Sequence, residues 1–226
     1  MPRKFRLDAS GKSASRSQYQ IQTYVNQHKE VLQRELSLLF GDSGLELTWL
    51  SPLTEDSYRE YWDKRALTRL GLEHLSPDLA AFWPSGGPHW DALAIGRAPQ
   101  STSRLLIEAK SHIPEMNSHC TAKAAASVEL ITSSLQRAQA KLGLAEPFDW
   151  MTKYYQYANR LAWLTWLQSH VPTRLVNIYF TNDEHAPTTS DEWLSELVLV
   201  KMRMGVTASI PGAYDLFLPA MPYPVL

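Results

Sequence analysis

Cysteine and long apolar runs are both scarce in this sequence. Cys120 is the only cysteine among the 226 residues, which excludes a disulfide within the chain and favours a reducing compartment. No stretch is apolar and long enough to span a bilayer, and the polar, basic first residues lack the apolar segment of a signal peptide. These absences predict a soluble, cytoplasmic protein with no membrane partner.

An excess of positive charge is lacking as well. Lys and Arg number 22 against 23 Asp and Glu, so the formal charge is −1 and the molecule has no overall basic footprint for nucleic acid. The basic residues are unevenly placed, because the first 17 residues hold one acid, Asp8, and these bases: Arg3, Lys4, Arg6, Lys12 and Arg16. We expect residues 1–17 to form a flexible, solvated basic arm, with contact to phosphates as the alternative, and residues 18–226 to form a single domain.

Apolar spacing and turn residues predict the secondary structure. Helical spacing covers residues 18–40, 56–70, 122–142, 150–170 and 191–204, and Thr189 with Glu192 predicts a capping box for the last of these helices. Short apolar or alternating runs predict strands over residues 45–50, 90–95, 104–110 and 173–180, with an edge strand over residues 213–218. This order predicts an α/β fold with a mixed central sheet flanked by helices on both faces.

Charged residues lie at the ends of two neighbouring strands of this prediction. Alternate side chains of a strand share a face, so Glu108 and Lys110 point to the same side, and Asp91 opens the strand that pairs with theirs. Charges at the end of an apolar strand are costly unless they pair or bind a metal. Two carboxylates can hold Mg²⁺, and a lysine can orient or help to deprotonate the attacking water. The pattern predicts phosphodiester hydrolysis, with a plain ion pair between Glu108 and Lys110 as the alternative.

The spacing from Asp91 to Glu108-Ala109-Lys110, at the end of an apolar run, resembles the PD-(D/E)xK, restriction-endonuclease-like nuclease superfamily, in a bacterial branch. The residue before Asp91 is not proline, unlike in the family's pattern. The resemblance implies an αβββαβ core with helical insertions, and Mg²⁺ or Mn²⁺ held by Asp91, Glu108 and the carbonyl of Ala109. It also implies that Lys110 acts on the nucleophilic water and that the partner is nucleic acid, with DNA as the expected polymer. A homodimer is left open.

Further residues are candidates for the same site. In several branches of this superfamily a Gln-containing helix follows the Glu-x-Lys strand, which makes Gln156 and Arg160 accessory residues by resemblance, with a solvated helix face as the alternative. A glutamate of the first helix often joins the metal site, and Glu30 or Glu35 would serve. Glu35 lies nearer the apolar side of that helix, and both acids are equally compatible with plain surface charge.

The leading prediction is a Mg²⁺-dependent deoxyribonuclease or restriction-like endonuclease that acts by in-line attack of water. Two predictions of other classes stay open. A binding or regulatory protein can keep the scaffold of a nuclease without turnover, which the missing basic footprint favours. The 8 Trp and 10 Tyr residues also allow a protein-interaction module that uses an aromatic surface.

Overall fold

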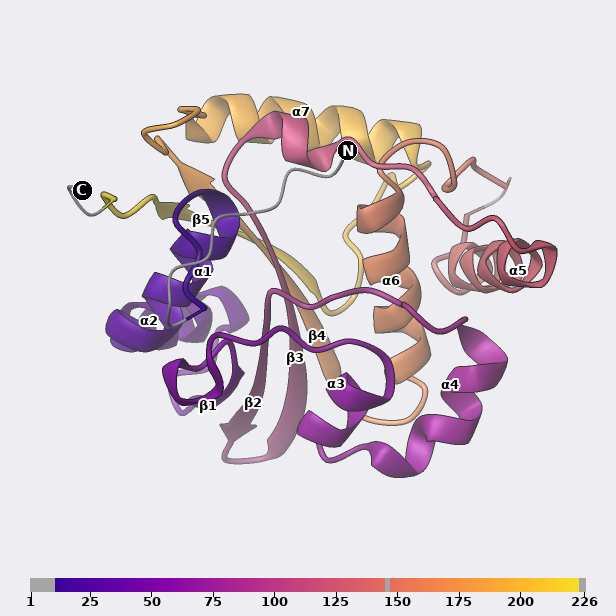
Figure 1. The fold of residues 1–226 in the computed structure, drawn as a ribbon, viewed down its shortest axis with the longest axis horizontal. Helices are drawn as coiled ribbons and strands as arrows, with labels where there is room; N and C mark the ends of the chain where they lie inside the picture. Colours follow the sequence, from indigo (N-terminus) through magenta and orange to yellow (C-terminus); the bar gives the residue numbers. More distant parts are fainter. Residues whose placement is uncertain (1–10, 145–146, 224–226) are drawn as a thin grey trace.

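A five-stranded mixed sheet forms the centre of the structure, a computed structural model that describes residues 11–144 and 147–223 (Figure 1). The strands lie in the order of the sequence: β1 (Glu46–Ser51), β2 (Ala92–Ala98), β3 (Ser101–Lys110), β4 (Thr173–Thr181) and β5 (Ala213–Pro219). β1, β2 and β3 form an antiparallel meander, whereas β4 runs parallel to β3 and β5 runs parallel to β4. The predicted α/β fold with a mixed sheet is therefore confirmed.

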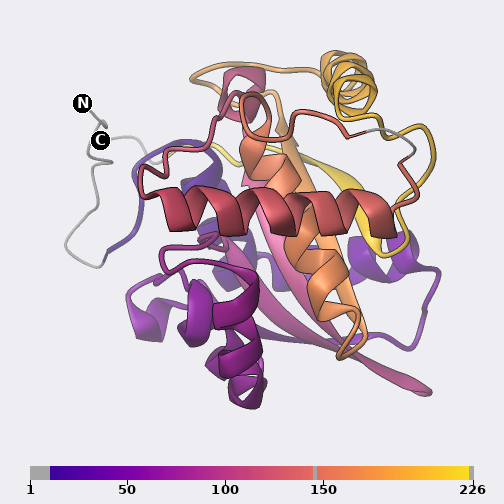
Figure 2. The same cartoon turned by 90° about the vertical axis from the view of Figure 1, so that its right-hand side faces the viewer.

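Helices cover both faces of this sheet (Figures 1 and 2). One face packs against α1 (Arg16–Gln27) and α2 (Lys29–Phe40). The other face and its margins carry α3 (Asp63–Arg69), α4 (Ser76–Phe82), α5 (Ala125–Lys141), α6 (Tyr155–Leu167) and α7 (Ser190–Arg203). Short 3-10 turns, η1 (Thr54–Asp56), η2 (Glu73–Leu75) and η3 (Ile113–Met116), lie between them. In the described part of the chain, no helix combines the length and the apolar sequence that crossing a bilayer requires.

The alternation of side chains along β3 decides which face carries the predicted site. Leu105, Ile107 and Ala109 belong to the core shared with α1 and α2, and Leu106 belongs to the opposite core shared with α6. Because alternate residues of a strand share a face, Glu108 follows Leu106 to the side that α6 covers. The end of β3 therefore places its charged residues between the sheet and α6.

The helix predicted over residues 18–40 is two helices. His28 has φ −133° and ψ 34°, which is outside the helical region, and it separates α1 from α2. Local spacing could not reveal this break, because the apolar residues on its two sides, Ile21, Val25, Leu32 and Leu36, belong to one buried cluster. The change of direction keeps α1 on the sheet and turns α2 aside (Figure 1).

The helix predicted over residues 56–70 begins only at Asp63. Ser57 (φ 51°) and Tyr58 (φ 53°) both have left-handed backbone conformations, and a right-handed helix cannot run through two such residues. A loop replaces the first half of the expected helix, and this loop places Glu60 near the start of β2. Two more differences concern helices: α4 has no counterpart among the expected elements, and α6 begins at Tyr155 because Tyr154 (φ 58°) is left-handed.

The basic arm predicted over residues 1–17 lies mainly outside the described residues, which begin at residue 11. Within the described part, Ser13 is buried and its backbone N–H donates a hydrogen bond to Gln22 Oε1 (2.8 Å). Arg16 already begins α1. The last residues of the arm are therefore attached to the first helix.

The capping box at the start of α7 is confirmed. The N–H of Glu192 donates to Thr189 Oγ1 (3.3 Å), and the N–H of Thr189 donates to Glu192 Oε2 (2.7 Å). Each side chain thus satisfies a backbone donor that the helix end leaves without an intrahelical partner.

Thr189→Ala is expected to lower the free energy of unfolding by about 1 kcal/mol, because the substitution removes the oxygen that accepts the N–H of Glu192. Urea denaturation followed by circular dichroism measures this loss. Thr207→Ala, at an exposed loop position beyond the other end of α7, is the matched control and should leave stability nearly unchanged. Equal losses in the two variants would contradict the capping role.

Candidate functional site

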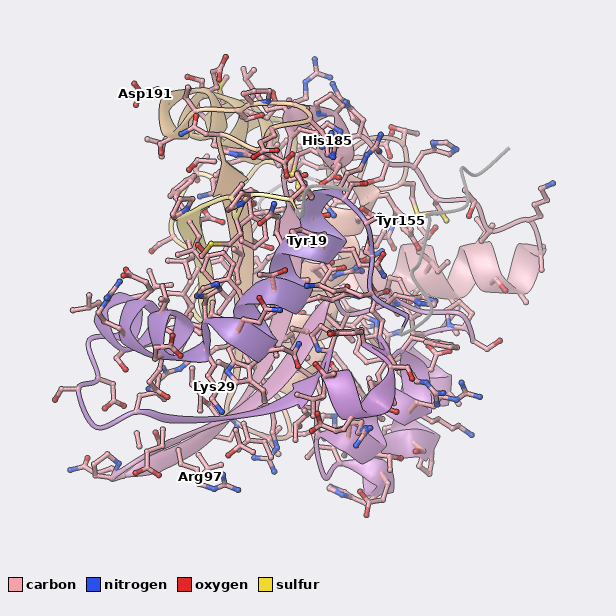
Figure 3. All side chains as sticks on the ribbon, turned by 60° about the vertical axis from the view of Figure 1, so that its left-hand side comes forward. Tyr19, Lys29, Arg97, Tyr155, His185 and Asp191 are labelled. Carbon is pink, nitrogen blue, oxygen red and sulfur yellow. The ribbon has the colours of Figure 1, made fainter. Side chains whose placement is uncertain are left out.

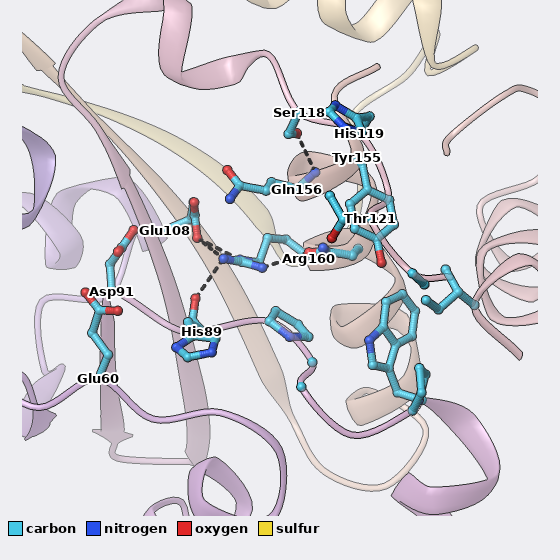
Figure 4. Close-up of a pocket in the computed structure, with 18 of the residues that line it drawn as sticks. Glu60, His89, Asp91, Glu108, Ser118, His119, Thr121, Tyr155, Gln156 and Arg160 are labelled. Atoms are coloured by element: carbon cyan, nitrogen blue, oxygen red, sulfur yellow. Dashed lines mark hydrogen bonds and ion pairs between the residues drawn. The ribbon is translucent and has the colours of Figure 1, made fainter. Parts of the chain in front are cut away.

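The ends of β2 and β3 bring two acids together. Asp91 immediately precedes β2, whose first residue pairs with Ile107, so Asp91 lies beside Glu108. The backbone N–H of Ala109 donates to Asp91 Oδ2 (2.7 Å) and holds this carboxylate against β3. Asp91, Glu108, Ala109 and Lys110 all line one cavity of about 760 Å³ (Figure 4). The structure therefore places the three predicted catalytic residues at a single site.

Glu108 is the buried charge of this site, with 6% of its surface exposed. Lys110 Nζ donates to Glu108 Oε1, and Arg160 Nε donates to Glu108 Oε2 (2.7 Å), so each oxygen binds a cation. Burial raises the pKa of Glu108, but the charges of Arg160 and Lys110 outweigh burial and lower the pKa overall. Burial likewise lowers the pKa of Lys110, but Glu108 and Asp91 outweigh it and raise the pKa. Both side chains of the pair are therefore charged.

Arg160 reaches Glu108 from α6 and is 4% exposed. Its Nη2 donates to the backbone oxygen of His89 (2.7 Å), and its Nη1 donates to Asn159 Oδ1 (2.7 Å). The guanidinium also lies over the ring of Trp90, 4.8 Å from its centroid. Figure 4 shows Arg160 pointing into the cavity toward Glu108. Arg160 is thus a buried member of the site and not part of a solvated helix face.

A third acid, Glu60, lies beside Asp91, and sequence reasoning missed it (Figure 4). Tyr61 and Trp90 form an antiparallel bridge, which sets the preceding residue, Glu60, opposite Asp91. Gln18 Nε2, at the start of α1, donates to Glu60 Oε1 (2.9 Å). No short-range pattern marks Glu60, because its position depends on a bridge between segments that are far apart in the sequence.

Negative charge exceeds positive charge at the floor of the cavity. Burial raises the pKa of Asp91 well above its ordinary value, and the charges of Glu108 and Glu60 raise it further. Burial also raises the pKa of Glu60, although the hydrogen bond from Gln18 opposes the shift. Three acids face the two bases Lys110 and Arg160, which leaves one formal negative charge without a cation when all five are ionised. Ionisation of all three acids together is therefore unfavourable in the folded protein.

Two loops form the walls of the cavity. Residues 84–88 make one wall, where the carboxylate of Asp63 accepts the N–H groups of Gly86 (2.6 Å) and Gly87 (2.8 Å). Residues 118–124 contribute to the other wall, where Ser118 Oγ accepts the N–H of Gln156 (2.9 Å). Gln156, the second accessory residue predicted on α6, thus lines the same cavity as Arg160. Trp83, Ile131 and Tyr155 also line the cavity, so its walls combine polar and apolar side chains.

The structure does not bring the predicted acids of the first helix, Glu30 and Glu35, to this cavity. Both lie on α2, which turns aside after His28; Glu30 is exposed, and Glu35 Oε1 pairs with Arg34 Nη2 at 2.7 Å. The part of the first helical segment that lines the cavity is the start of α1, through Ser17 and Gln18. The expectation that one of these acids joins the site is therefore not met, and the acid that lies beside Asp91 is Glu60, from the loop before α3.

No family model, curated protein or solved structure matches the chain in comparisons with each of the three. Among the described residues, no group of three or more His, Cys, Asp and Glu side chains has the arrangement of a ready metal site. An ionised carboxylate has about four lone-pair directions, and the hydrogen bonds from Lys110 and Arg160 use two of those of Glu108. The oxygens of Asp91, Glu60 and Glu108 are of the type that Mg²⁺ and Mn²⁺ prefer.

Asp91→Asn is expected to raise the free energy of unfolding of the metal-free protein at neutral pH. The folded state raises the pKa of Asp91, so above about pH 4 the unfolded chain loses a proton that the folded chain retains, and stability falls as pH rises. Asparagine removes this cost, and its Oδ1 can still accept the N–H of Ala109. The advantage of the variant should shrink as the pH approaches 4 in urea denaturation experiments.

Glu108→Gln is the matched variant, and it is expected to lower the free energy of unfolding where Asp91→Asn raises it. The folded state lowers the pKa of Glu108, so its ionised form stabilises the fold above the unfolded pKa, and this contribution is lost as pH falls. We expect a loss of about 3 kcal/mol at neutral pH, because the substitution leaves two buried cations without their anion. If both variants changed stability in the same direction, the surplus of negative charge at Asp91 would be disproved.

Proposed function

We propose that this protein is a metal-dependent nuclease of the PD-(D/E)xK type that hydrolyses phosphodiester bonds of nucleic acid, with DNA as the preferred polymer and the cytoplasm as the setting. The observation that carries the proposal is the convergence of Asp91, Glu108 and Lys110 on one cavity floor. The order of elements around them, a helix, a three-stranded meander, helices and a parallel strand, supports it. A homodimer is proposed on separate grounds below.

The acids of the floor suit a Mg²⁺ or Mn²⁺ ion. Asp91, Glu108 and the carbonyl oxygen of Ala109 would hold it, and Glu60 offers a further carboxylate beside Asp91. Carboxylate and carbonyl oxygens are the ligands that these hard ions prefer. When bound, such an ion supplies polarisation of the phosphoryl group and a lowered pKa of a bound water molecule. Burial, together with the charges of Glu108 and Glu60, raises the pKa of Asp91, and a bound cation would offset this cost, which supports the assignment.

Lys110 contributes to this chemistry as a cation. Because the raised pKa of Lys110 keeps its ammonium protonated, it orients the attacking water by donating hydrogen bonds and does not accept a proton from it. Its charge also stabilises the negative charge that develops on the phosphoryl oxygens. Arg160, on α6, donates a hydrogen bond to Glu108 Oε2 and fixes the orientation of this carboxylate. The remaining lone pairs of Glu108 therefore keep a fixed direction.

The rim of the cavity offers groups that suit the nucleic-acid backbone. Lys123 and His119 lie on the wall formed by residues 118–124, and Gln18 lies at the start of α1. Amide and ammonium groups of this kind bind phosphate and sugar oxygens without reading base sequence. This local arrangement supports nucleic-acid binding in a chain whose total charge does not.

One observation favours a second candidate, a nuclease-fold protein that binds nucleic acid or protein without cleaving it. Both oxygens of Glu108 already bind cations of the chain itself, Lys110 and Arg160, and this weakens the attraction for an external ion. Arg160 would then serve as a permanent substitute for part of the metal charge. Retention of labelled oligonucleotides without cleavage in Mg²⁺ or Mn²⁺ would favour this candidate.

Lys110→Met is the sharpest test of the nuclease proposal. We expect a fall in kcat of at least about 10²-fold, because the variant loses the charge that acts on the water and on the phosphoryl oxygens. The affinity for Mn²⁺, measured by calorimetry, should not fall, because the variant removes a cation that competes for Glu108 Oε1. Asp91→Asn, in contrast, should lose both metal binding and cleavage. Cleavage is measured on a panel of duplex DNA, single-stranded DNA and RNA.

Lys123→Met is the matched control, since it removes the same charged group from the rim of the same cavity. It should raise KM with little change in kcat, because a rim lysine contributes to binding in the ground and transition states alike. Equal cleavage rates for the wild type and Lys110→Met would remove the proposed role of Lys110. Failure of the wild type to cleave any polymer of the panel with either metal would refute the nuclease activity itself.

A further inference from the structure

Exposed apolar side chains gather at α7. Among the described residues, large apolar side chains with substantial exposure number six, and all but Leu38 lie on α7 or against its C-terminal end: Leu194, Val198, Leu199, Met202 and Phe148. The four on α7 are between 51% and 68% exposed. The ring of Phe148 lies against Gly205, just beyond α7, and continues the patch. Such concentration, unlike scattered exposure, indicates a binding surface.

The helix already uses its opposite face for the core. Trp193, Leu197 and Val200 are buried against the sheet, with Trp193 Nε1 donating to the backbone oxygen of Phe180 (3.0 Å). Leu194, Val198 and Met202 follow each other at intervals of four residues, so they form one stripe along the solvent side of α7. We call these three residues the outer stripe. α7 lies at the periphery of the molecule in both ribbon views, so the outer stripe is accessible along its whole length (Figures 1 and 2).

We propose that the outer stripe of α7 is the interface of a two-fold dimer, in which α7 of one copy packs antiparallel against α7 of a second copy. Val198 is the middle residue of the stripe, so it would lie at the two-fold axis. Leu194 of each copy would then contact Met202 of the other. An isologous interface of this kind needs a surface that is complementary to itself.

The charges at the two ends of α7 are complementary in this way. Asp191 and Glu192 lie in the first turn of α7, and Lys201 and Arg203 lie in the last turn. Figure 3 shows Asp191 at the outer end of the helix. An antiparallel arrangement sets the acidic end of each helix against the basic end of the other, whereas a parallel arrangement sets like charges together. Asp191 precedes Leu194 by three residues and Lys201 follows Val198 by three, so these two charges border the outer stripe, whereas Glu192 and Arg203 lie on sides of the helix turned away from it. Lys201 also binds Asp215 of its own chain (2.8 Å).

The acidic end also argues against a lipid surface as the occupant. Helices that lie on membranes carry Lys and Arg along the whole polar margin and are attracted to anionic lipids. In α7 the basic residues are confined to the last turn, and the first turn carries two acids. A second copy of the chain, packed antiparallel, places opposite charges at both ends of α7.

The size of the surface sets the expected strength. α7 has 14 residues and is about 21 Å long. The exposed side of one such helix is smaller in area than the roughly 800 Å² that each partner contributes to a standard interface. We therefore expect a reversible dimer with a dissociation constant on the order of micromolar. Sedimentation equilibrium over a range of protein concentrations up to about 500 µM measures it.

Val198→Asp is the first test, because it places two carboxylates together at the two-fold axis. The dissociation constant should rise at least about tenfold, while circular dichroism stays unchanged because the position is exposed in the monomer. Leu38→Asp is the matched control: Leu38 is 71% exposed on α2, and the same change there should leave the dimer intact. Neither variant touches a residue that lines the cavity, so the measurement is independent of nuclease activity.

The flanking charges provide a second test. Asp191→Lys should weaken the dimer several-fold, because it sets a cation against the basic end of the partner helix. High salt should reduce this effect, because about 1 M salt screens charges beyond roughly 3 Å. Glu192→Gln is the matched control, because Glu192 lies on a side of α7 turned away from the outer stripe. It should leave the dimer intact without unfolding the helix start, since glutamine can replace glutamate in a capping box. A wild type that stays monomeric over the whole concentration range, or a dimer that Val198→Asp leaves intact, would overturn the proposal. Binding of the monomer to anionic vesicles through the outer stripe would overturn it in favour of a lipid surface.

Discussion

The ion pairs of Glu108 are the constraint on which the rest of the structure depends. A carboxylate that is 6% exposed is stable only with cations close by, and Lys110 and Arg160 provide them from two different elements. Lys110 lies two residues further along β3, whereas Arg160 comes from α6, which must cross the same end of the sheet. The crossover from β3 through α5 and α6 to the parallel strand β4 is therefore tied to one buried charge.

The same cluster keeps a surplus of negative charge that the fold does not neutralise. Asp91 and Glu60 meet through the bridge between Tyr61 and Trp90, and both have raised pKa values. A protein selected only for stability would separate these acids or pair one of them, because the arrangement opposes folding at neutral pH. Destabilising clusters of this kind are typical of functional sites, where binding of a ligand removes the conflict.

Local pattern was sufficient to predict the sheet and the part of the site that lies on it. The alternation along β3 puts Glu108 and Lys110 on one face, and the pairing of β2 with β3 sets Asp91 beside them. Glu60 escaped prediction because two left-handed residues, Ser57 and Tyr58, end the expected helix and a long-range bridge then places the loop. Arg160 and Glu108 are 52 residues apart in the sequence. Helical spacing could suggest Arg160 as an accessory residue, but it could not identify Glu108 as its partner.

A hydrogen bond connects the segment before α6 to the core side of α7. The hydroxyl of Tyr154, which precedes α6, donates a hydrogen bond to Glu196 Oε1 on α7 (2.9 Å). Glu196 lies toward the core side of α7, so a second copy that covers Leu194, Val198 and Met202 leaves this contact undisturbed. α7 can therefore support the start of α6, and with it the position of Arg160, whether or not its solvent side is covered.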